Sequence, residues 1–198
     1  MHGLINQAIE RFARDTYGPV FWDRLCRRQN LPVRAFEAMQ TYDPVVTEEI
    51  LDGLAFALGK GRDEVLEDIG TFLVSSPSTA ALRRLLRFGG TSFIDFLYSL
   101  DDLPARVRLA VPELTLPQME LREHGRRSFS FVVKSDDTRK PWFGHVMVGL
   151  LRAMADDYGA LVVLEHMGAS PGREIIAIML LEAAYTEGRA FDLGARAP

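Results

Sequence analysis

The chain contains 198 residues, of which 47% are hydrophobic and 25% are charged, and its formal net charge is -4. This length suits one domain, or one domain divided into two subdomains, and the ordinary composition argues against intrinsic disorder and repeat arrays. The mildly acidic balance also argues against a nucleic-acid-binding protein, which needs a basic face to neutralise phosphates.

Residues 1–112 show the 3.6-residue periodicity of amphipathic helices. The first helix carries Leu4, Ile5 and Ala8 on one apolar face and ends at Gly18, and Pro19 opens the next helix. A third helix follows Asp43-Pro44 and ends at Gly59. Further helices are predicted around residues 65–73, 82–86 and 93–97, and a last short one runs from residue 104 to near residue 112.

After residue 112 the period changes to that of strands. Alternation over residues 119–133 around a turn at Gly125 predicts a hairpin, and a helix over residues 142–158 closes at Gly159. The apolar runs 161–167 and 175–181 predict a second hairpin. We therefore expect an α+β fold, in which an N-terminal helical subdomain (1–112) precedes an antiparallel sheet of two hairpins with a packed helix (113–183). Residues 1–183 form one domain in this prediction, and residues 184–198 are a tail.

Several features predict where the protein resides. No apolar run approaches the ~20 residues that span a bilayer, and the first residues lack the basic start and apolar centre of a signal peptide. The single cysteine, Cys26, has no partner for an internal disulfide, which fits a reducing compartment. We therefore expect a cytoplasmic protein. Because Cys26 shares the apolar side of its helix with Trp22 and Leu25, we expect it to have a structural role.

Local motifs do not indicate an enzyme. The chain lacks G-x-S-x-G, H-E-x-x-H, paired C-x-x-C and Walker motifs. The acidic pair Asp101-Asp102 is interpreted as a helix cap. The remaining polar candidates are four scattered histidines without a zinc pattern (His2, His124, His145 and His166) and three arginines interpreted as a solvated helix face (Arg83, Arg84 and Arg87).

Several short motifs follow one another in a distinctive order. They are MHGLINQAI at residues 1–9, TYG at 16–18 with Trp22, DEVLE at 63–67, F-x-x-F-L-x-x-L-D-x-L at 93–103, ARV at 105–107, PEL at 112–114 with Pro117, VGLL at 148–151 and YG at 158–159. Together, across residues 1–183, they resemble the haem-NO/oxygen-binding (H-NOX or HNOB) domain family. The resemblance implies the α+β fold predicted above, a sensor or binding role, and a haem pocket between the helical and sheet halves.

The same resemblance implies an altered haem site. In the family, a histidine directly after the last leucine of L-D-x-L-H holds the iron, and here Pro104 occupies that position. The family's Y-x-S-x-R motif binds the haem propionates, and the matching positions are Val133, Ser135 and Asp137, of which only the serine is retained. The charge of Asp137 would repel a propionate. Arg139 and Lys140 in the following loop are the candidates to contact a propionate in place of the missing arginine. We therefore expect no haem bound in the family's usual way.

Another apolar ligand, such as a fatty acid or a tetrapyrrole without the usual axial bond, could occupy the pocket, or side chains could fill it. An empty porphyrin-sized cavity would cost stability. The predicted lining comprises Leu4, Ile5, Ala8, Phe72, Phe93, Phe96, Leu97, Met119 and Trp142, with Phe88 as a further filling candidate.

Three functional hypotheses follow. The first is a non-enzymatic H-NOX-like sensor or binding module without standard haem ligation. The second is a haem-based NO/O2 sensor whose axial ligand is His145 or His2. The third is a ligand-free interaction protein. Family resemblance implies a signalling partner in trans, such as a histidine kinase or a cyclic-dinucleotide enzyme.

Overall fold

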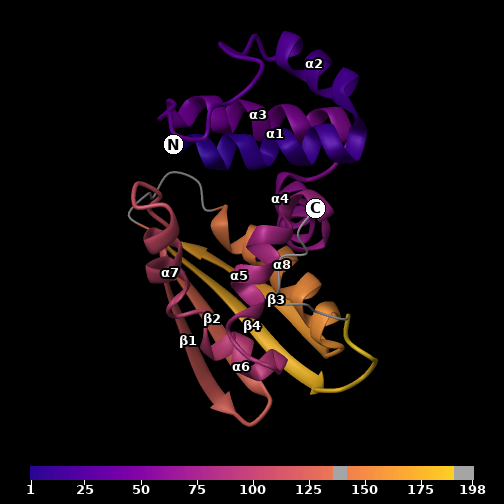
Figure 1. Ribbon diagram of the computed structural model, residues 1–198, viewed down its shortest axis with the longest axis vertical. Helices are drawn as coiled ribbons and strands as arrows, with labels where there is room; N and C mark the ends of the chain where they lie inside the picture. Colours follow the sequence, from indigo (N-terminus) through magenta and orange to yellow (C-terminus); the bar gives the residue numbers. More distant parts are fainter. Residues whose placement is uncertain (136–141, 190–198) are drawn as a thin grey trace, which may run out of the picture.

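The computed structural model describes residues 1–135 and 142–189, in which helices precede a four-stranded sheet (Figure 1). The helices of the first half are α1 (Gly3–Tyr17), α2 (Pro19–Arg28), α3 (Pro44–Leu58), α4 (Arg62–Ser75), the 3-10 helix η1 (Pro77–Thr79), α5 (Ala80–Arg87), α6 (Phe93–Tyr98) and α7 (Leu103–Ala110). The second half contains β1 (Gln118–Gly125), β2 (Ser128–Lys134), α8 (Phe143–Tyr158), β3 (Leu161–Ser170) and β4 (Arg173–Glu182). The predicted α+β class is confirmed.

The helix boundaries fall where the capping residues predict them. Gly18, with a φ of 90°, separates α1 from α2, and Gly59 and Gly159 end α3 and α8 in the left-handed conformation. The side chain of Asp43 accepts a hydrogen bond from the backbone N–H of Val45 at 2.9 Å and so caps α3. Within the described ranges, no helix has the length and apolar character that a membrane crossing requires.

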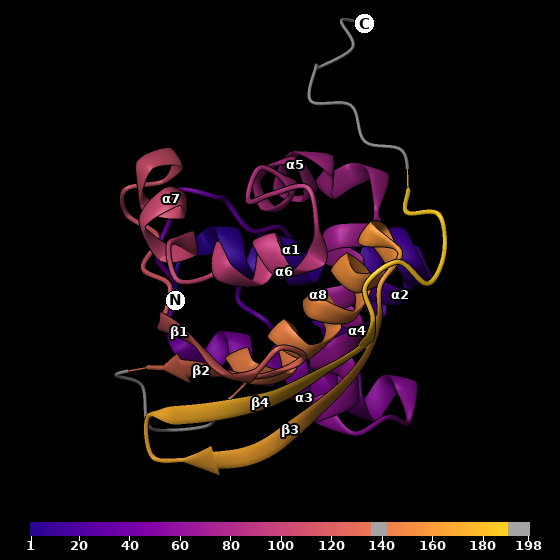
Figure 2. The same cartoon turned by 90° about the horizontal axis from the view of Figure 1, so that it is seen from below.

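The sheet has the strand order β1-β2-β4-β3, and every neighbouring pair is antiparallel. The two predicted hairpins are therefore joined through β2 and β4, with Phe131 opposite Ile176. Figure 2 shows α5, α6, α7 and α8 on one side of the sheet. Alternate side chains of the strands point toward these helices and are buried, among them Phe129, Phe131, Val133, Ile176, Ile178 and Leu180.

Helix α8 packs between the sheet and α4, and two glycines permit the close approach of α4 and α8. A Cβ atom on Gly70 of α4 would lie 2.0 Å from the carbonyl oxygen of Val146. A Cβ atom on Gly149 of α8 would lie 1.9 Å from the carbonyl oxygen of Glu67. The hydroxyl of Thr71 also donates to the carbonyl of Gly149 at 3.3 Å. The two helix backbones are thus in direct contact at this crossing.

The buried side chains form two clusters. The helical core lies among α1, α2, α3 and α4 and includes Phe12, Trp22 and Leu54. The sheet core lies between the sheet and α5 to α8 and includes Phe96 and Phe131. Helix α8 contributes to both clusters, because Val146 belongs to the helical core whereas its neighbours in sequence, Met147 and Val148, belong to the sheet core. The two halves of the chain therefore meet along α8.

The segment that follows β4 returns to the C-terminal end of α8. The backbone N–H groups of Tyr185 and Thr186 donate to the carbonyl of Gly159 at 2.7 and 3.1 Å. The N–H of Arg189 donates to the carbonyl of Asp157 at 3.0 Å. Residues 185–189 are therefore held against α8 by backbone hydrogen bonds.

Candidate functional site

Pro104 lies in the first turn of α7, which begins at Leu103. Its ring is half-buried, while Leu103 and Val107 of the same helix are buried in the sheet core. A proline in the first turn costs no intrahelical hydrogen bond, so the helix tolerates it there. The pyrrolidine ring has no electron pair to offer a metal ion. Position 104 is thus a fixed, apolar position.

Two side chains hold this helix in place. The carboxylate of Asp101 accepts a hydrogen bond from the backbone N–H of Leu121 on β1 at 2.6 Å. The guanidinium of Arg106 donates to the carbonyl of Ser99 at 3.0 Å and to that of Leu85 at 3.2 Å. Asp101 therefore ties the turn before α7 to the sheet. Asp102 occupies the expected N-cap position of α7, but its side chain makes no capping hydrogen bond among the described residues.

Only the first part of the predicted propionate-binding stretch, Val133 and Ser135, lies among the described residues. Val133 lies on β2 opposite Met119 of β1 and Glu174 of β4, and its side chain is 1% exposed in the sheet core. Ser135 follows the strand, and its backbone N–H donates to the carbonyl of Gly172 at 2.9 Å. The other three candidates, Asp137, Arg139 and Lys140, lie outside the described residues.

The apolar residues predicted to line a pocket fall on both sides of the boundary between the two cores. Phe93, Phe96, Leu97 and Met119 belong to the sheet core. Ile5, Phe72 and Trp142 pack against the helical core, and Leu4 and Ala8 are half-buried. The prediction that Phe88 turns inward is wrong, because its side chain is 75% exposed after the end of α5. The rings of Trp142 and Phe143 lie 5.6 Å apart and connect the two sides.

One face of α1 points toward η1 and the start of α5. Leu4, Ala8, Arg11 and Asp15 are spaced three or four residues apart and so share a face of the helix. The guanidinium of Arg11 donates to the carbonyl of Ser78 at 3.3 Å, and the carboxylate of Asp15 accepts from the hydroxyl of Ser78 at 2.7 Å. Because Ser78 lies in η1, directly before α5, this face of α1 lies at the boundary between the two cores.

Two of the histidines are engaged in ways that oppose iron binding. His2 caps α1, because its Nδ1 atom accepts a hydrogen bond from the N–H of Leu4 at 3.2 Å. This contact places the ring proton on Nε2, which is buried and has no hydrogen-bond partner among the described residues. A metal ligand must present a deprotonated nitrogen, so His2 cannot bind iron without losing the cap. His124 on β1 contacts the hydroxyl of Ser130 at 2.8 Å.

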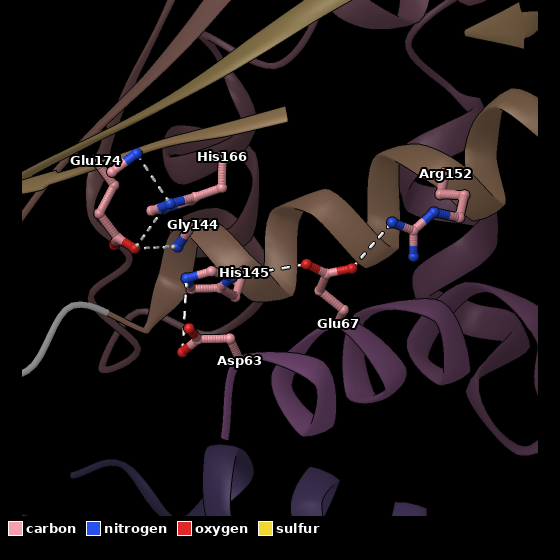
Figure 3. A network of polar contacts seen from close by, with 8 residues as sticks. Asp63, Glu67, Gly144, His145, Arg152, His166 and Glu174 are labelled. Carbon is pink, nitrogen blue, oxygen red and sulfur yellow. Dashed lines mark hydrogen bonds and ion pairs between the residues drawn. The ribbon is translucent and has the colours of Figure 1, made fainter. Parts of the chain in front are cut away.

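The other two histidines stack on one another. The rings of His145 on α8 and His166 on β3 lie 4.0 Å apart and are inclined by 21° (Figure 3). Carboxylates from α4 and β4 surround them, with Asp63 and Glu67 near His145 and Glu174 near His166. In the part of the chain that the structure describes, no three histidine, cysteine or acidic side chains are arranged to hold a metal ion. Each ring instead has a nitrogen that faces a carboxylate oxygen, at 3.6 Å for His145 and 3.3 Å for His166.

A buried ion pair was not predicted from the sequence. The carboxylate of Asp157 on α8 is bound by Arg83 of α5, and Arg87 lies 4.0 Å away with its guanidinium over the ring of Tyr158. The interpretation of Arg83 and Arg87 as a solvated face is therefore wrong, whereas Arg84 is exposed. The acidic pair Asp156-Asp157 at the end of a largely apolar helix was the available signal.

Comparisons with known proteins agree with this architecture. The profile of the family described as Haem-NO-binding (HNOB) matches residues 2–166. The chain belongs to this family. A relative is soluble guanylate cyclase 89Da of Drosophila melanogaster, which is 24% identical over 167 residues, or 84% of this chain and 25% of that protein. Another is soluble guanylate cyclase gcy-31 of Caenorhabditis elegans, 22% identical over 166 residues, or 83% of this chain and 23% of that protein.

Solved structures of H-NOX proteins share the fold. The S. oneidensis H-NOX protein in the Fe(II)NO ligation state superposes with a TM-score of 0.76 at 17% identity, over 92% of this chain and 100% of that one. The I5F mutant of T. tengcongensis H-NOX gives a TM-score of 0.73 at 18% identity, over 92% and 99% of the two chains. At this identity the likeness shows the fold alone. The chain spans about a quarter of the curated guanylate cyclases that it matches.

Proposed function

We propose that this chain is a non-enzymatic sensor or binding module that does not hold haem in the manner usual for its family. The observation that carries the proposal is the pyrrolidine ring of Pro104 in the first turn of α7, the position that resemblance to the family assigns to the iron-binding histidine. The axial bond is the dominant link between haem iron and protein, and proline cannot supply it.

Two further features support this proposal. The position that resemblance assigns to the propionate-binding tyrosine is Val133, whose side chain is packed in the sheet core. Without the tyrosine hydroxyl, one hydrogen bond to a propionate is missing. His2 caps a helix and His145 and His166 stack between carboxylates, so each of these three histidines would have to break existing contacts to become the axial ligand.

We place the ligand site at the boundary between the helical core and the sheet core. Leu4 and Ala8 on α1 contribute from one side, and Phe93 and Met119 contribute from the sheet core. These side chains are apolar, so the ligand class is a long apolar molecule such as a fatty acid. A carboxylate on such a ligand would bind near Ser135, with Arg139 and Lys140 as further candidates in the adjoining segment. The output, as for the family, would pass to a signalling protein in trans, such as a histidine kinase or a cyclic-dinucleotide enzyme.

Expression with an added haem precursor, followed by absorption spectroscopy of the purified protein, tests the first half of this proposal. We expect far less than one haem per chain. An intense Soret band that persists through purification at one haem per chain would overturn the proposal and favour a haem sensor with an unusual axial ligand.

Native mass spectrometry of the same preparation tests the second half. A discrete added mass that is released on unfolding would support a buried apolar ligand. Ala8→Trp fills the α1 face at the boundary and should reduce the occupancy of that ligand, whereas Val20→Trp on the exposed side of α2 should not. A protein without added mass, which also fails to take up fatty acid from solution, would favour the ligand-free interaction protein instead.

A further inference from the structure

A network of charged and titratable side chains connects four elements at the beginning of α8 (Figure 3). His145 lies in the first turn of α8, and its ring stacks on that of His166 from β3. Asp63 and Glu67 approach His145 from α4. Glu174 approaches His166 from β4, and its side chain is 5% exposed. The helical half and the sheet half of the chain thus meet at two aromatic rings that can each take up a proton.

The surroundings of His166 fit a neutral ring. Its Nδ1 atom accepts a hydrogen bond from the backbone N–H of Gly168 at 3.3 Å, so the proton lies on Nε2. Nε2 faces the carboxylate of Glu174 at 3.3 Å, and the same Glu174 oxygen accepts from the N–H of Gly144 at 3.0 Å. A second proton on His166 would have to sit on Nδ1, where it would point at the N–H of Gly168. Protonation of His166 therefore opposes an existing contact.

The surroundings of His145 fit a protonated ring. Its Nε2 atom lies 3.6 Å from a carboxylate oxygen of Asp63, and its Nδ1 atom lies 3.7 Å from one of Glu67. Both neighbours are hydrogen-bond acceptors, and a neutral ring carries one N–H group, so it can satisfy one of them at most. Nδ1 is buried and has no hydrogen-bond partner within the described ranges. Only the imidazolium form offers an N–H group to both carboxylates.

We infer that His145 is the proton acceptor of this stacked pair and acts as a pH-dependent clamp between α4 and α8. When the ring is protonated, Asp63 and Glu67 are drawn toward it, and both contacts shorten to hydrogen-bond length. His166 stays neutral and presents its ring face to the cation. Two imidazolium rings 4.0 Å apart would repel each other, so the pair takes up one proton before the second.

One other charged group bears on this network. The guanidinium of Arg152, two turns along α8, binds the second carboxylate oxygen of Glu67 at 2.9 Å. Glu67 is therefore shared between a permanent cation and His145, whereas Asp63 is 68% exposed. The groups facing the two rings are thus Asp63 and Glu67 from α4, Arg152 from α8 itself and Glu174 from β4. These groups are three carboxylates and one guanidinium.

The clamp would act on the contact between the two halves of the chain. The α4–α8 crossing is a close backbone contact in which Gly70 and Gly149 leave no room for a side chain. His145 lies one helical turn from Gly149 on α8, and Glu67 lies one turn from Gly70 on α4. A proton on His145, by drawing Asp63 and Glu67 of α4 toward α8, therefore tightens the crossing. This regulation does not depend on which ligand occupies the chain.

Imidazole nitrogen NMR of the full chain, recorded from pH 5 to about 8, tests the inference. Chemical shifts of the ring nitrogens distinguish imidazolium from each neutral tautomer, and His145→Gln and His166→Gln assign the signals. We expect His145 to become imidazolium while His166 still shows the Nε2–H tautomer. The inference fails if His166 takes up the first proton, or if the two rings titrate independently of one another.

Neutralising Asp63 and Glu67 tests whether these two carboxylates are the reason that His145 takes up the proton. In the Asp63→Asn/Glu67→Gln variant, we expect His145 to lose its precedence over His166 in taking up the first proton, because both acceptors of the imidazolium become neutral. The matched control is Glu165→Gln, which neutralises an exposed carboxylate next to His166 in β3 and should leave the His145 titration unchanged. An unchanged His145 titration in the double variant would overturn the clamp. If the double variant does not fold, the order of protonation in the wild-type chain still decides the question.

Discussion

The carboxylate of Asp157, near the end of α8, is bound by two parallel hydrogen bonds from the guanidinium of Arg83 on α5. The Nη2–Oδ1 distance is 2.6 Å and the Nε–Oδ2 distance is 2.9 Å. The side chain of Asp157 is 1% exposed, so this charge depends on its partner for the interactions that water would otherwise supply. Arg87 adds a hydrogen bond to the backbone carbonyl of Asp157 at 3.3 Å. The pair thereby fixes α5 against the end of α8.

Asp157→Asn is therefore expected to destabilise the fold. Removing the negative charge takes away the buried carboxylate that binds the guanidinium of Arg83 through two hydrogen bonds, and we expect the free energy of unfolding to fall by about 3 kcal/mol. Urea unfolding followed by circular dichroism measures the change. Asp68→Asn is the control, because it removes a carboxylate that pairs with Lys60 on the surface and should alter stability by less than about 0.5 kcal/mol. Equal losses in the two variants would contradict the argument.

The α4–α8 crossing gives a second stability prediction. In Gly149→Ala the new Cβ atom would lie 1.9 Å from the carbonyl oxygen of Glu67, so the two helices must move apart. We expect a loss of at least ~3 kcal/mol, since neither backbone can yield as a flexible side chain could. Gly125→Ala is the matched control, because a Cβ atom there meets nothing within 4 Å. A Gly149→Ala protein as stable as the control would show that the helices are not held at this spacing.

Much of the fold could be predicted from the sequence, because its signals are local. Gly18, Asp43, Gly59 and Gly159 mark helix ends through their own backbone or side-chain chemistry, and each acts there in the structure. Strand alternation likewise located both hairpins. The pairing of β2 with β4 is different, because it joins strands separated by the 38 residues 135–172 and leaves no mark in either strand alone.

The polar contacts of the site could not be predicted in the same way. Asp63 and His145 are 82 residues apart, and His145 and His166 are 21 apart, so no spacing rule brings them together. Their proximity follows from the α4–α8 crossing and from the register of β3 and β4. A polar residue in an apolar segment was the one available hint, for Glu174 in β4 as well as for Asp157 in α8. The roles proposed for Pro104, Val133 and Ser135 still rest on family resemblance and stay predictions.

The thiol of Cys26 is expected to be unreactive in the folded protein. Its side chain is 3% exposed, and burial, with a smaller contribution from the charge of Glu10, raises its pKa from 9.0 to about 11. A rise of two pKa units lowers the thiolate fraction near pH 8 about a hundredfold, and the thiolate is the reactive form. Labelling with a thiol reagent should therefore be at least ~100-fold slower in the native protein than in urea. Rapid labelling of the folded chain would contradict the structural role.

The raised pKa of Cys26 also predicts that the free energy of unfolding depends on pH. Between pH 9.0 and about 11 the thiol of the unfolded chain loses its proton while the folded chain keeps it, so the pKa difference favours unfolding as the pH rises. The stabilising contribution is fully present below pH 9.0 and is lost toward pH 11. Cys26→Ala removes this titration. The difference in unfolding free energy between wild type and Cys26→Ala should therefore change in favour of the variant over this range, and a constant difference would refute the prediction.

Restoring haem binding is expected to need both parts of the site. In Pro104→His the iron gains an axial ligand, but Val133 and Asp137 still provide no propionate contacts, so we expect weak haem binding. Adding Val133→Tyr and Asp137→Arg should strengthen it at least about tenfold, since one charge-assisted hydrogen bond contributes roughly 1.5–3 kcal/mol. Haemin titration followed by the Soret band measures the affinities. Because Val133 is 1% exposed, the Val133→Tyr/Asp137→Arg protein without the histidine must be shown to remain folded. If the single variant binds haem as tightly as the triple variant, the propionate positions do not limit binding, and Pro104 alone accounts for the loss.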